Sequence, residues 1–407
     1  MSQAIPKRTI GSITTWYSGG TPNRSRGEYW NGNIPWISAF TLKDSEISTS
    51  NQFLTAQGVE AGSRMAPIGS TLLLVRGSAL HKEIRAGMVV EPVAFNQDVK
   101  ALVPKRGLVP KYLTHVIRAN ESELLKLVTS AGNTAGVLDT KVLQSFEIYF
   151  PSESEQQVLA KAFDDVDNLI ASLERLTAKK QAIKQGIMYQ LLTGRTRFPG
   201  HVGRWSRVTV GDVADVKTGP FGSALHESDY VAAGTPIITV EHLGERRVNA
   251  TNAPMVSESD SRRLGAYRLK LGDVVFSRVG SIDRNSLISD SEEGWLFSGR
   301  LLRVRFDQSQ ADPAFMSAQF HAKQFREAVR TVAVGQTMPS LNTAILRNIS
   351  IDLPPLAEQI AIGKVHADLN RELDVLECRL AKARNIRQGM MQELLTGRTL
   401  LSIGVMA

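Results

Sequence analysis

Pro151-Ser-Glu-Ser-Glu-Gln-Gln157 opens a stretch of sequence that closes with Gln190-Leu-Leu-Thr-Gly-Arg-Thr196. A second stretch opens with Pro354-Pro-Leu-Ala-Glu-Gln359 and closes with Glu393-Leu-Leu-Thr-Gly-Arg-Thr399. Both the first and the last residues of the two stretches lie 203 positions apart, so the copies align without a gap. The chain is therefore an internal duplication, and the rest of the sequence is organised around these two segments.

Both segments have the pattern of long helices. Apolar residues recur every seven positions in two rows of the first segment, Leu159, Val166, Leu173 and Ile187 (interrupted by Lys180) and Ala162, Leu169, Leu176 and Ile183; the second segment repeats the first row as Ile362, Leu369, Leu376, Ala383 and Met390. Two rows at alternating spacings of three and four are typical of a coiled coil. We predict that the two helices pack on each other, the alternative being that each packs on its own domain.

The residues at the segment ends support this prediction. Proline at each start suits a helix entrance, and Gly194 and Gly397 suit its exit. Gly186 and Gly389 are unfavourable inside a helix and indicate a bend or a close helix crossing. Roughly 40 residues at about 1.5 Å each give a rod of about 60 Å.

Composition limits the class of protein. The 407 residues suffice for two or three domains, with 42% apolar and 22% charged residues. No apolar run reaches the ~20 residues of a membrane span, and no apolar signal core follows the N-terminus, so we expect a cytoplasmic protein.

Cys378 is the single cysteine, which excludes an internal disulfide or a cysteine-built zinc site; we expect it to be a packing residue. Net charge is +8, whereas only 6% of residues are aromatic, which argues against a surface for stacking single strands.

The remaining sequence reads as two α+β domains. Residues 1–150 contain short strand patterns at Ile34–Ser38, Ser70–Val75 and Glu147–Phe150, and a helix pattern from Pro110 to about Leu127. Residues 197–353 repeat this order, with Gly272–Ser277 matching Gly69–Leu74. We therefore predict a first globular domain at 1–150, a helix at 151–196, a second globular domain at 197–353, a helix at 354–399 and a tail at 400–407.

Catalytic motifs are missing from the sequence. There is no phosphate-binding glycine loop, no dinucleotide-binding glycine pattern and no Asn-Pro-Pro-Tyr-type string for amino-methyl transfer. Asp98-Val-Lys100 and Asp215-Val-Lys217 resemble part of a nuclease motif, but matches of three residues arise by chance. The seven histidines show no metal-binding spacing. We predict that the chain is not an enzyme and carries no metal or cofactor of its own.

Basic residues in the two globular domains are the candidates for binding nucleic acid, because Arg and Asn read base edges while Lys and Ser hold phosphates. The candidates are Arg24, Arg26, Lys43, Arg76, His81, Lys82 and Arg85 in the first domain, and Lys217, His242, Arg246, Arg278, Arg284, Asn285 and Arg300 in the second. The loops Gly77–Lys82 and Gly280–Asn285 are preferred because they occupy matching places. Each of these residues could equally belong to an ordinary solvated surface.

Several motifs together resemble the DNA specificity (S) subunits of Type I restriction–modification systems over nearly the whole chain. They are Gly19-Gly-Thr-Pro22, Glu28-Tyr-Trp-Asn-Gly-Asn-Ile-Pro-Trp-Ile-Ser38, Asn96-Gln-Asp-Val-Lys-Ala-Leu102, Thr218-Gly-Pro-Phe-Gly-Ser223, Ser228-Asp-Tyr230, Gly272-Asp-Val-Val-Phe276, Pro354-Pro-Leu-Ala-Glu-Gln359 and Leu394-Leu-Thr-Gly-Arg398 with its twin at Leu191. The first helix departs from the family pattern by starting Pro-Ser instead of Pro-Pro.

The resemblance implies a pseudo-twofold molecule in which two target recognition domains each read one half of a split DNA site. Two antiparallel helices would act as a ruler for the unread gap, since successive major-groove faces lie about 34 Å apart. The resemblance also implies two adenine-N6 methyltransferase subunits and two motor–nuclease subunits as partners, which would carry S-adenosylmethionine, ATP and Mg²⁺. The alternative is a coiled-coil scaffold whose two heads bind proteins; a chain that is itself an enzyme has the least support.

Overall fold

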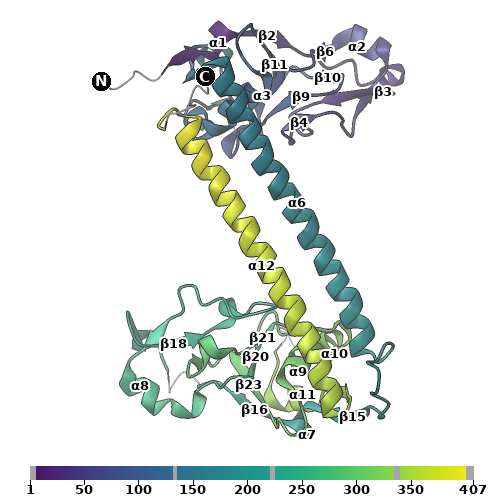
Figure 1. Ribbon diagram of the computed structural model, residues 1–407, viewed down its shortest axis with the longest axis vertical. Helices are drawn as coiled ribbons and strands as arrows, with labels where there is room; N and C mark the ends of the chain where they lie inside the picture. Colours follow the sequence, from purple (N-terminus) through teal and green to yellow (C-terminus); the bar gives the residue numbers. More distant parts are fainter. Residues whose placement is uncertain (1–5, 132–134, 221–224, 334–339, 400–407) are drawn as a thin grey trace, which may run out of the picture. The chain divides into compact units, whose positions relative to one another are not determined.

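The computed structural model describes residues 6–131, 135–220, 225–333 and 340–399, which form two compact units (Figure 1). Unit 1 comprises the described residues up to Glu174 and from Arg379 onward, and unit 2 comprises Arg175–Cys378. Each unit contains one globular head and parts of two long helices. Residues Phe221–Ser223 of the Thr218 motif lie outside the described residues.

Head 1, the described residues up to 150, is built mainly from two sheets. One has the strand order β2-β11-β7-β9-β4, with bounds Thr14–Ser18, Val99–Pro104, Thr71–Leu74, Ala86–Val89 and Glu46–Ile47. The other has the order β5-β3-β10-β6, with bounds Phe53–Leu54, Trp30–Ile37, Val93–Phe95 and Arg64–Ala66. Smaller sheets pair β1 (Lys7–Thr9) with β14 (Glu147–Tyr149), and β12 (Thr129–Ala131) with β13 (Ala135–Val137) and β8 (Arg76–Gly77).

The helices of head 1 are short. They are α1 (Ile10–Ile13), α2 (Ala56–Gly62), α3 (Pro110–Ala119), α4 (Glu121–Leu125) and α5 (Thr140–Ser145), with 3₁₀ turns η1 (Gly27–Tyr29) and η2 (Ser78–His81). The predicted helix from Pro110 to Leu127 is thus broken at Asn120. The side-chain amide of Asn120 donates to the carbonyl of Val116 at 2.7 Å, and its backbone leaves the helical region at φ −92°, ψ 18°. A polar side chain that competes for backbone groups ends α3 there.

Head 2, residues 197–353, repeats this frame. One sheet has the order β16-β23-β20-β21, with bounds Ala214–Thr218, Leu301–Phe306, Val274–Ser277 and Asn285–Leu287. The other has the order β17-β19-β18-β22, with bounds Tyr230–Val231, Met255–Val256, Thr235–Ile238 and Leu296–Phe297, and β15 (Ser206–Thr209) pairs with β24 (Ser350–Leu353). The helices are α7 (Val210–Val213), α8 (Glu258–Arg263), α9 (Pro313–His321), α10 (Lys323–Ala333) and α11 (Thr343–Arg347), with 3₁₀ turns η3 (Glu227–Asp229), η4 (Val240–His242), η5 (Gly265–Tyr267) and η6 (Asp290–Glu292).

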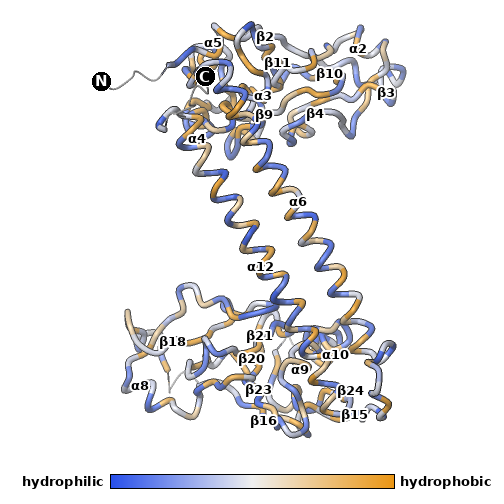
Figure 2. Tube along the Cα trace, in the orientation of Figure 1, coloured by the Kyte–Doolittle hydropathy of each residue, from blue (hydrophilic) through white to orange (hydrophobic). Residues whose placement is uncertain are grey.

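The strand pairings confirm the duplication. In both heads four strands pair antiparallel in the same order, β2-β11-β7-β9 in head 1 and β16-β23-β20-β21 in head 2. In both heads the second sheet contains one parallel pair, β3 with β10 and β18 with β22. Figure 2 shows apolar residues recurring along these strands, as expected for sheets with one face in a core.

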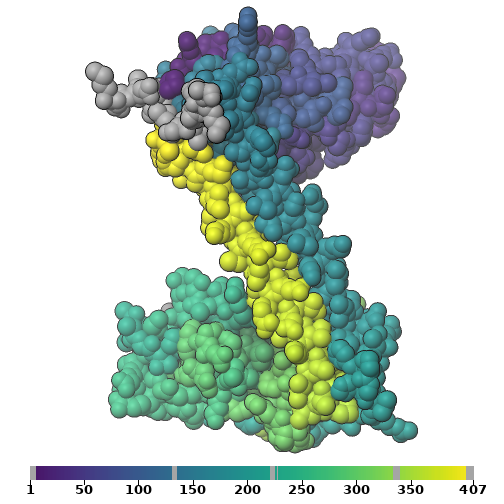
Figure 3. All heavy atoms as spheres, in the orientation of Figure 1, coloured from purple at the N-terminus to yellow at the C-terminus, as the bar shows by residue number. Residues whose placement is uncertain are grey.

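The long helices α6 (Glu153–Leu192) and α12 (Leu356–Leu394) pair antiparallel within each unit, and their atoms touch in Figure 3. In unit 1 Glu174 accepts from Arg384 at 2.6 Å. In unit 2 Lys180 donates to Glu372 at 2.6 Å, and Lys184 donates to Asn370 at 2.5 Å. The prediction that the helices pack on each other is confirmed, although their ends also pack on the heads.

One of the predicted helix rows was wrong. Leu169, Leu176 and Ile183 are 51%, 42% and 41% exposed, so their row lies outside the seam. The row one position further along lies inside, with Phe163 and Leu191 buried and Ile170, Thr177 and Lys184 half-buried. On α12 the predicted row is the inner one, because Ile362, Leu376 and Ala383 are buried and Leu369 and Met390 are half-buried.

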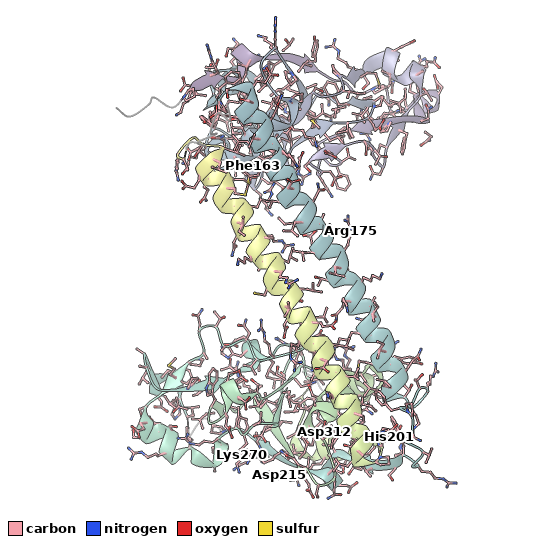
Figure 4. The ribbon with its side chains drawn as sticks, in the orientation of Figure 1. Phe163, Arg175, His201, Asp215, Lys270 and Asp312 are labelled. Atoms are coloured by element: carbon pink, nitrogen blue, oxygen red, sulfur yellow. The ribbon has the colours of Figure 1, made fainter. Side chains whose placement is uncertain are left out.

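The glutamine of the repeated Glu-Gln pair has a structural role that is the same in both units. The fully buried side chain of Gln156 accepts from the backbone N–H of Val109 at 2.9 Å and donates to the carbonyls of Gly107 and Pro151 at 3.1 and 3.0 Å. Gln359 accepts from Asp312, labelled in Figure 4, at 2.9 Å and donates to two carbonyls at 2.9 and 2.8 Å. Each glutamine therefore joins the start of a long helix to the loop before the third helix of its head.

The repeated Thr-Gly-Arg-Thr string ends each long helix. Gly194 and Gly397 adopt φ values of +68° and +72°, a conformation that glycine takes easily. The N–H of Thr196 donates to the carbonyl of Gln190 at 3.2 Å, and Thr399 makes the matching bond to Glu393 at 2.9 Å. The string is therefore a helix stop, as the glycine positions predicted.

A side chain added at Gly186 or Gly389 would meet no atom within 4 Å, so the helices make no close crossing at either glycine, and a bend there stays a prediction. The expectation for the cysteine was wrong. Cys378 is exposed on α12 and is not a packing residue. Within the described residues, no helix is long and apolar enough to cross a membrane.

Candidate nucleic-acid interface

Head 1 presents an arginine stacked on two tryptophans. The guanidinium carbon of Arg24 lies 5.4 Å from the ring centre of Trp30 and 5.7 Å from that of Trp36. Both tryptophans lie on β3, whose pairing with β5 is irregular between Trp30 and Ile34. Their ring centres are 5.2 Å apart in an edge-to-face arrangement. The exposed Arg24 side chain is therefore held over an aromatic surface without a carboxylate partner within the described residues.

Two further arginines in head 1 are held in the same way. Arg26 lies 5.8 Å from the ring of Tyr29, and Arg64 lies 5.5 Å from the ring of Tyr17. Arg26 also forms an exposed ion pair with Glu28 at 3.6 Å. Although the chain has few aromatic residues, four of them are gathered here. Neither the overall aromatic content nor the spacing of the tryptophans could reveal this, because the pairing of β3 is irregular between Trp30 and Ile34.

Arg24 follows a loop whose backbone is hydrogen-bonded to the neighbouring strand. The N–H of Gly20 donates to the carbonyl of Phe95 at 3.0 Å, and a side chain added at Gly19 would come within 2.0 Å of that oxygen. Gly219 of head 2 is held the same way, since an added side chain would meet the carbonyl of Ser298 at 2.1 Å. The glycines of both motifs are thus needed for close backbone approach to the neighbouring strand.

The other head 1 candidates divide into two groups. Arg76, His81, Lys82 and Lys43 are exposed, and the ammonium of Lys43 lies 5.0 Å from the ring of Phe40. Arg85 is instead held inside the head, where it donates to the carbonyl of Ala39 at 2.8 Å and pairs with Glu83 at 2.6 Å. Arg85 therefore stabilises its loop.

In head 2 a smaller set remains accessible. The ammonium of Lys217 lies 4.6 Å from the ring of Tyr267 and donates to the carbonyl of Ala266 at 2.9 Å. Arg300 is exposed and Arg278 is half-buried. Lys217 thus lies against an aromatic ring, as the stacked arginines of head 1 do, although it stands at another place in the strand order.

Three head 2 candidates are held within the protein. Arg246 pairs with Asp374 at 2.9 Å and with Glu377, both on α12. His242 and Asn285 are only 4% and 1% exposed; His242 accepts from the N–H of Thr239 at 3.0 Å, and the Asn285 amide nitrogen donates to the carbonyl of Asp283 at 3.3 Å. Arg284 is exposed and donates to the carbonyl of Leu243. The sequence could not show which of these side chains are buried.

Several buried titratable groups lie on the long helices or near them. Burial lowers the pKa of His321 to about 3 and that of His366 to about 4, and it lowers the pKa of the neighbouring Lys184. In unit 1 burial also lowers the pKa of His115, against the opposing effect of Asp164 at 3.3 Å. Within the described residues, no group of three or more His, Cys, Asp or Glu could hold a metal ion.

The comparison with known proteins identifies the family. The model described as "Type I restriction modification DNA specificity domain" matches residues 5–185 and again residues 203–382. The chain belongs to this family. The two matches correspond to the two copies of the duplication, and each contains a head followed by most of a long helix.

Relatives of this specificity subunit confirm the assignment. The specificity subunit of type I restriction enzyme EcoR124I/EcoR124II from Escherichia coli is 32% identical over 44% of this chain and 45% of its own length. The MjaIX specificity subunit from Methanocaldococcus jannaschii is 25% identical over 88% of this chain and 84% of its own. A solved S subunit from M. genitalium matches the fold with a TM-score of 0.67 at 14% identity, covering 97% of each chain. The comparisons therefore support DNA sequence specificity and do not favour the protein-binding scaffold.

Proposed function

We propose that this specificity subunit reads a split, asymmetric DNA site, with one head on each half-site. The observation that carries the proposal is that the two heads have the same order of paired strands but expose different cations. Head 1 presents Arg24 on two tryptophans, whereas head 2 presents Lys217 on one tyrosine. An arginine fork can bind a guanine edge through two hydrogen bonds, which a lysine ammonium cannot do in the same geometry.

The long helices would set the unread gap between the half-sites. An α6 of 40 residues is about 60 Å long. A matched insertion of one heptad in both helices would add about 10 Å, or roughly three base pairs of DNA. We expect such a variant to lengthen the gap and leave both half-site sequences unchanged.

The partners would be two adenine-N6 methyltransferase subunits and, in the full complex, two motor–nuclease subunits. These would bring S-adenosylmethionine, ATP and Mg²⁺, while this chain would contribute recognition without catalysis. The exposed apolar residues Leu169, Leu176 and Ile183 on α6 offer a docking surface, and Leu176 lines a hollow with Leu376 of α12. A solved chain from work on "complex assembly" of the type I system matches this fold with a TM-score of 0.55, which supports the fold alone.

Mapping of methylated adenines in cells that carry this chain and its methyltransferase tests the proposal. A split motif with a fixed gap is expected. Arg24→Ala should weaken or relax one half-site, with a loss of about 1–3 kcal/mol if Arg24 reads a base. Lys217→Ala is the matched control and should affect the other half-site. A continuous palindrome, or equal effects of both variants on both halves, would refute the arrangement.

A further inference from the structure

Unit 1 contains a basic cavity that the proposed function does not use. Its volume is about 340 Å³, and it lies between the loop before β9, the end of α3 and the last part of α12. The charged residues that line it are Lys43, Glu83, Arg85, Arg118, Glu121 and Arg387. Four cations therefore face two carboxylates in a confined space.

Among these cations, Arg118 and Lys43 have no carboxylate partner within the described residues. Arg85 is held by Glu83 and the carbonyl of Ala39, and Arg387 is held by Asp167. The exposed ammonium of Lys43 lies 5.0 Å from the ring of Phe40, whereas the half-buried side chain of Arg118 has no hydrogen-bond or ion-pair partner among the residues that the structure describes.

The surroundings of Arg118 leave its charge uncompensated. Glu121 uses one carboxylate oxygen to accept from the N–H of Ile84 at 2.7 Å. Burial lowers the pKa of the Arg118 guanidinium, the positive charge of Arg387 lowers it further, and the nearby carboxylates oppose this only in part. Because a guanidinium stays protonated in proteins, Arg118 is a half-buried charge with free donors.

The duplication shows that the fold does not require this arginine. In unit 2, 203 positions along the chain, His321 stands in place of Arg118 and Lys184 in place of Arg387. Burial lowers the pKa of His321 to about 3, so the imidazole is neutral at pH 7. Lys184 donates to Asn370, which itself occupies the position of Asp167. The same junction is therefore built in unit 2 with a neutral imidazole in place of the Arg118 guanidinium, and that imidazole contacts the guanidinium of Arg326 at 3.0 Å.

We propose that the cavity of unit 1 binds a phosphate group, with Arg118 as its principal ligand and Lys43 and Arg387 beside it. The planar fork of a guanidinium matches the oxygens of a phosphate, and the negative charge of the phosphate would offset the uncompensated charge of Arg118. A volume of about 340 Å³ is at the small end of ligand sites, which suits a phosphate ester better than a large cofactor. The phosphate can come from a free phosphate ester or from the DNA backbone.

Titration calorimetry of the full chain with inorganic phosphate and with ATP tests the free source. Arg118→Gln removes the fork, and Arg118→His installs the residue that unit 2 carries at the same place and so preserves the packing. Arg106→Gln, an exposed position in the same head, is the control for net charge. We expect at least a tenfold loss of affinity in both Arg118 variants and none in the control.

A salt series of duplex DNA binding with the same variants tests the backbone source. One lost phosphate contact lowers the slope of log affinity against log salt by about one. A tenfold loss for phosphate with an unchanged DNA slope assigns the site to a free ester, and a reduced slope assigns it to the DNA backbone. If the wild-type chain binds neither probe through Arg118, so that all variants match it in both assays, the proposal is overturned.

Discussion

The buried glutamines at the starts of the long helices give the sharpest test of how helix and head are joined. Gln156→Leu keeps a side chain of similar size but removes all three hydrogen bonds to Val109, Gly107 and Pro151. At about 1 kcal/mol for each bond, the loss is about 3 kcal/mol, and more if the orphaned backbone groups stay dry. The N–H of Val109 should then exchange with solvent roughly a hundredfold faster, since about 1.4 kcal/mol corresponds to a factor of ten.

Native-state amide exchange measures this effect residue by residue. Gln359→Leu is the twin variant, and it should accelerate the N–H of Asp312, whose acceptor it removes at 2.9 Å. Gln157→Leu is the control because that side chain is exposed next to Gln156; surface changes of this kind cost within about 0.5 kcal/mol. If Gln156→Leu leaves Val109 within tenfold of the wild-type rate, the glutamine is not the anchor that its bonds indicate.

Two further predictions concern the helix seam. Because the pKa of His366 is about 4 in the folded state and about 6.5 when unfolded, the unfolded chain binds the proton first as pH falls. Between pH 6.5 and 4 His366 alone should lower the stability of unit 2 by up to about 3 kcal/mol, and His321 adds to this loss. His366→Phe installs the residue found at the matched Phe163 and should reduce this loss of stability, measured by urea unfolding at pH 7 and 4.5. His226→Phe changes an exposed site and is the control. An equal loss of stability in the two variants would contradict the prediction. Leu173→Ala should cost about 2–3 kcal/mol because Leu173 is 9% exposed, and Leu176→Ala should cost less than about 1 kcal/mol because Leu176 is 42% exposed; equal losses in urea unfolding would refute the assignment of the seam.

The duplication and the helix ends could be predicted because they depend on local sequence. The constant spacing between the two repeated segments can be seen in the sequence without any knowledge of how the chain packs. Proline before a helix and glycine after it act through their own backbone preferences, and α6 does begin after Pro151 and end before Gly194. Features that are decided by one residue and its neighbours are therefore readable from the sequence.

The rotation of α6 could not be predicted from its pattern, because rows three and four positions after Leu173 were both possible. The ends of the helix decide between them. Phe163, labelled in Figure 4, enters the core of head 1 with its ring 5.3 Å from that of His115, and Leu191 enters the core of head 2. These contacts turn the less apolar row inward. Its polar member Lys184 then requires a partner, which Asn370 supplies.

The sequence could predict that the candidate site uses cationic side chains, but not which ones. A sequence shows the cations and does not show which groups lie opposite them. Arg24 and Arg246 look alike in the sequence, yet Arg24 is stacked on tryptophans while Arg246 is neutralised by Asp374, 128 residues away. The internal copy supplies a comparison that a single sequence otherwise lacks. Where both copies keep the same residue with the same hydrogen bonds, as at Gln156 and Gln359, the residue stabilises the fold that the two copies share. Where one frame carries different charges, as at Arg118 and His321, stability does not dictate the choice, and that difference marks Arg118 as the residue to test for binding.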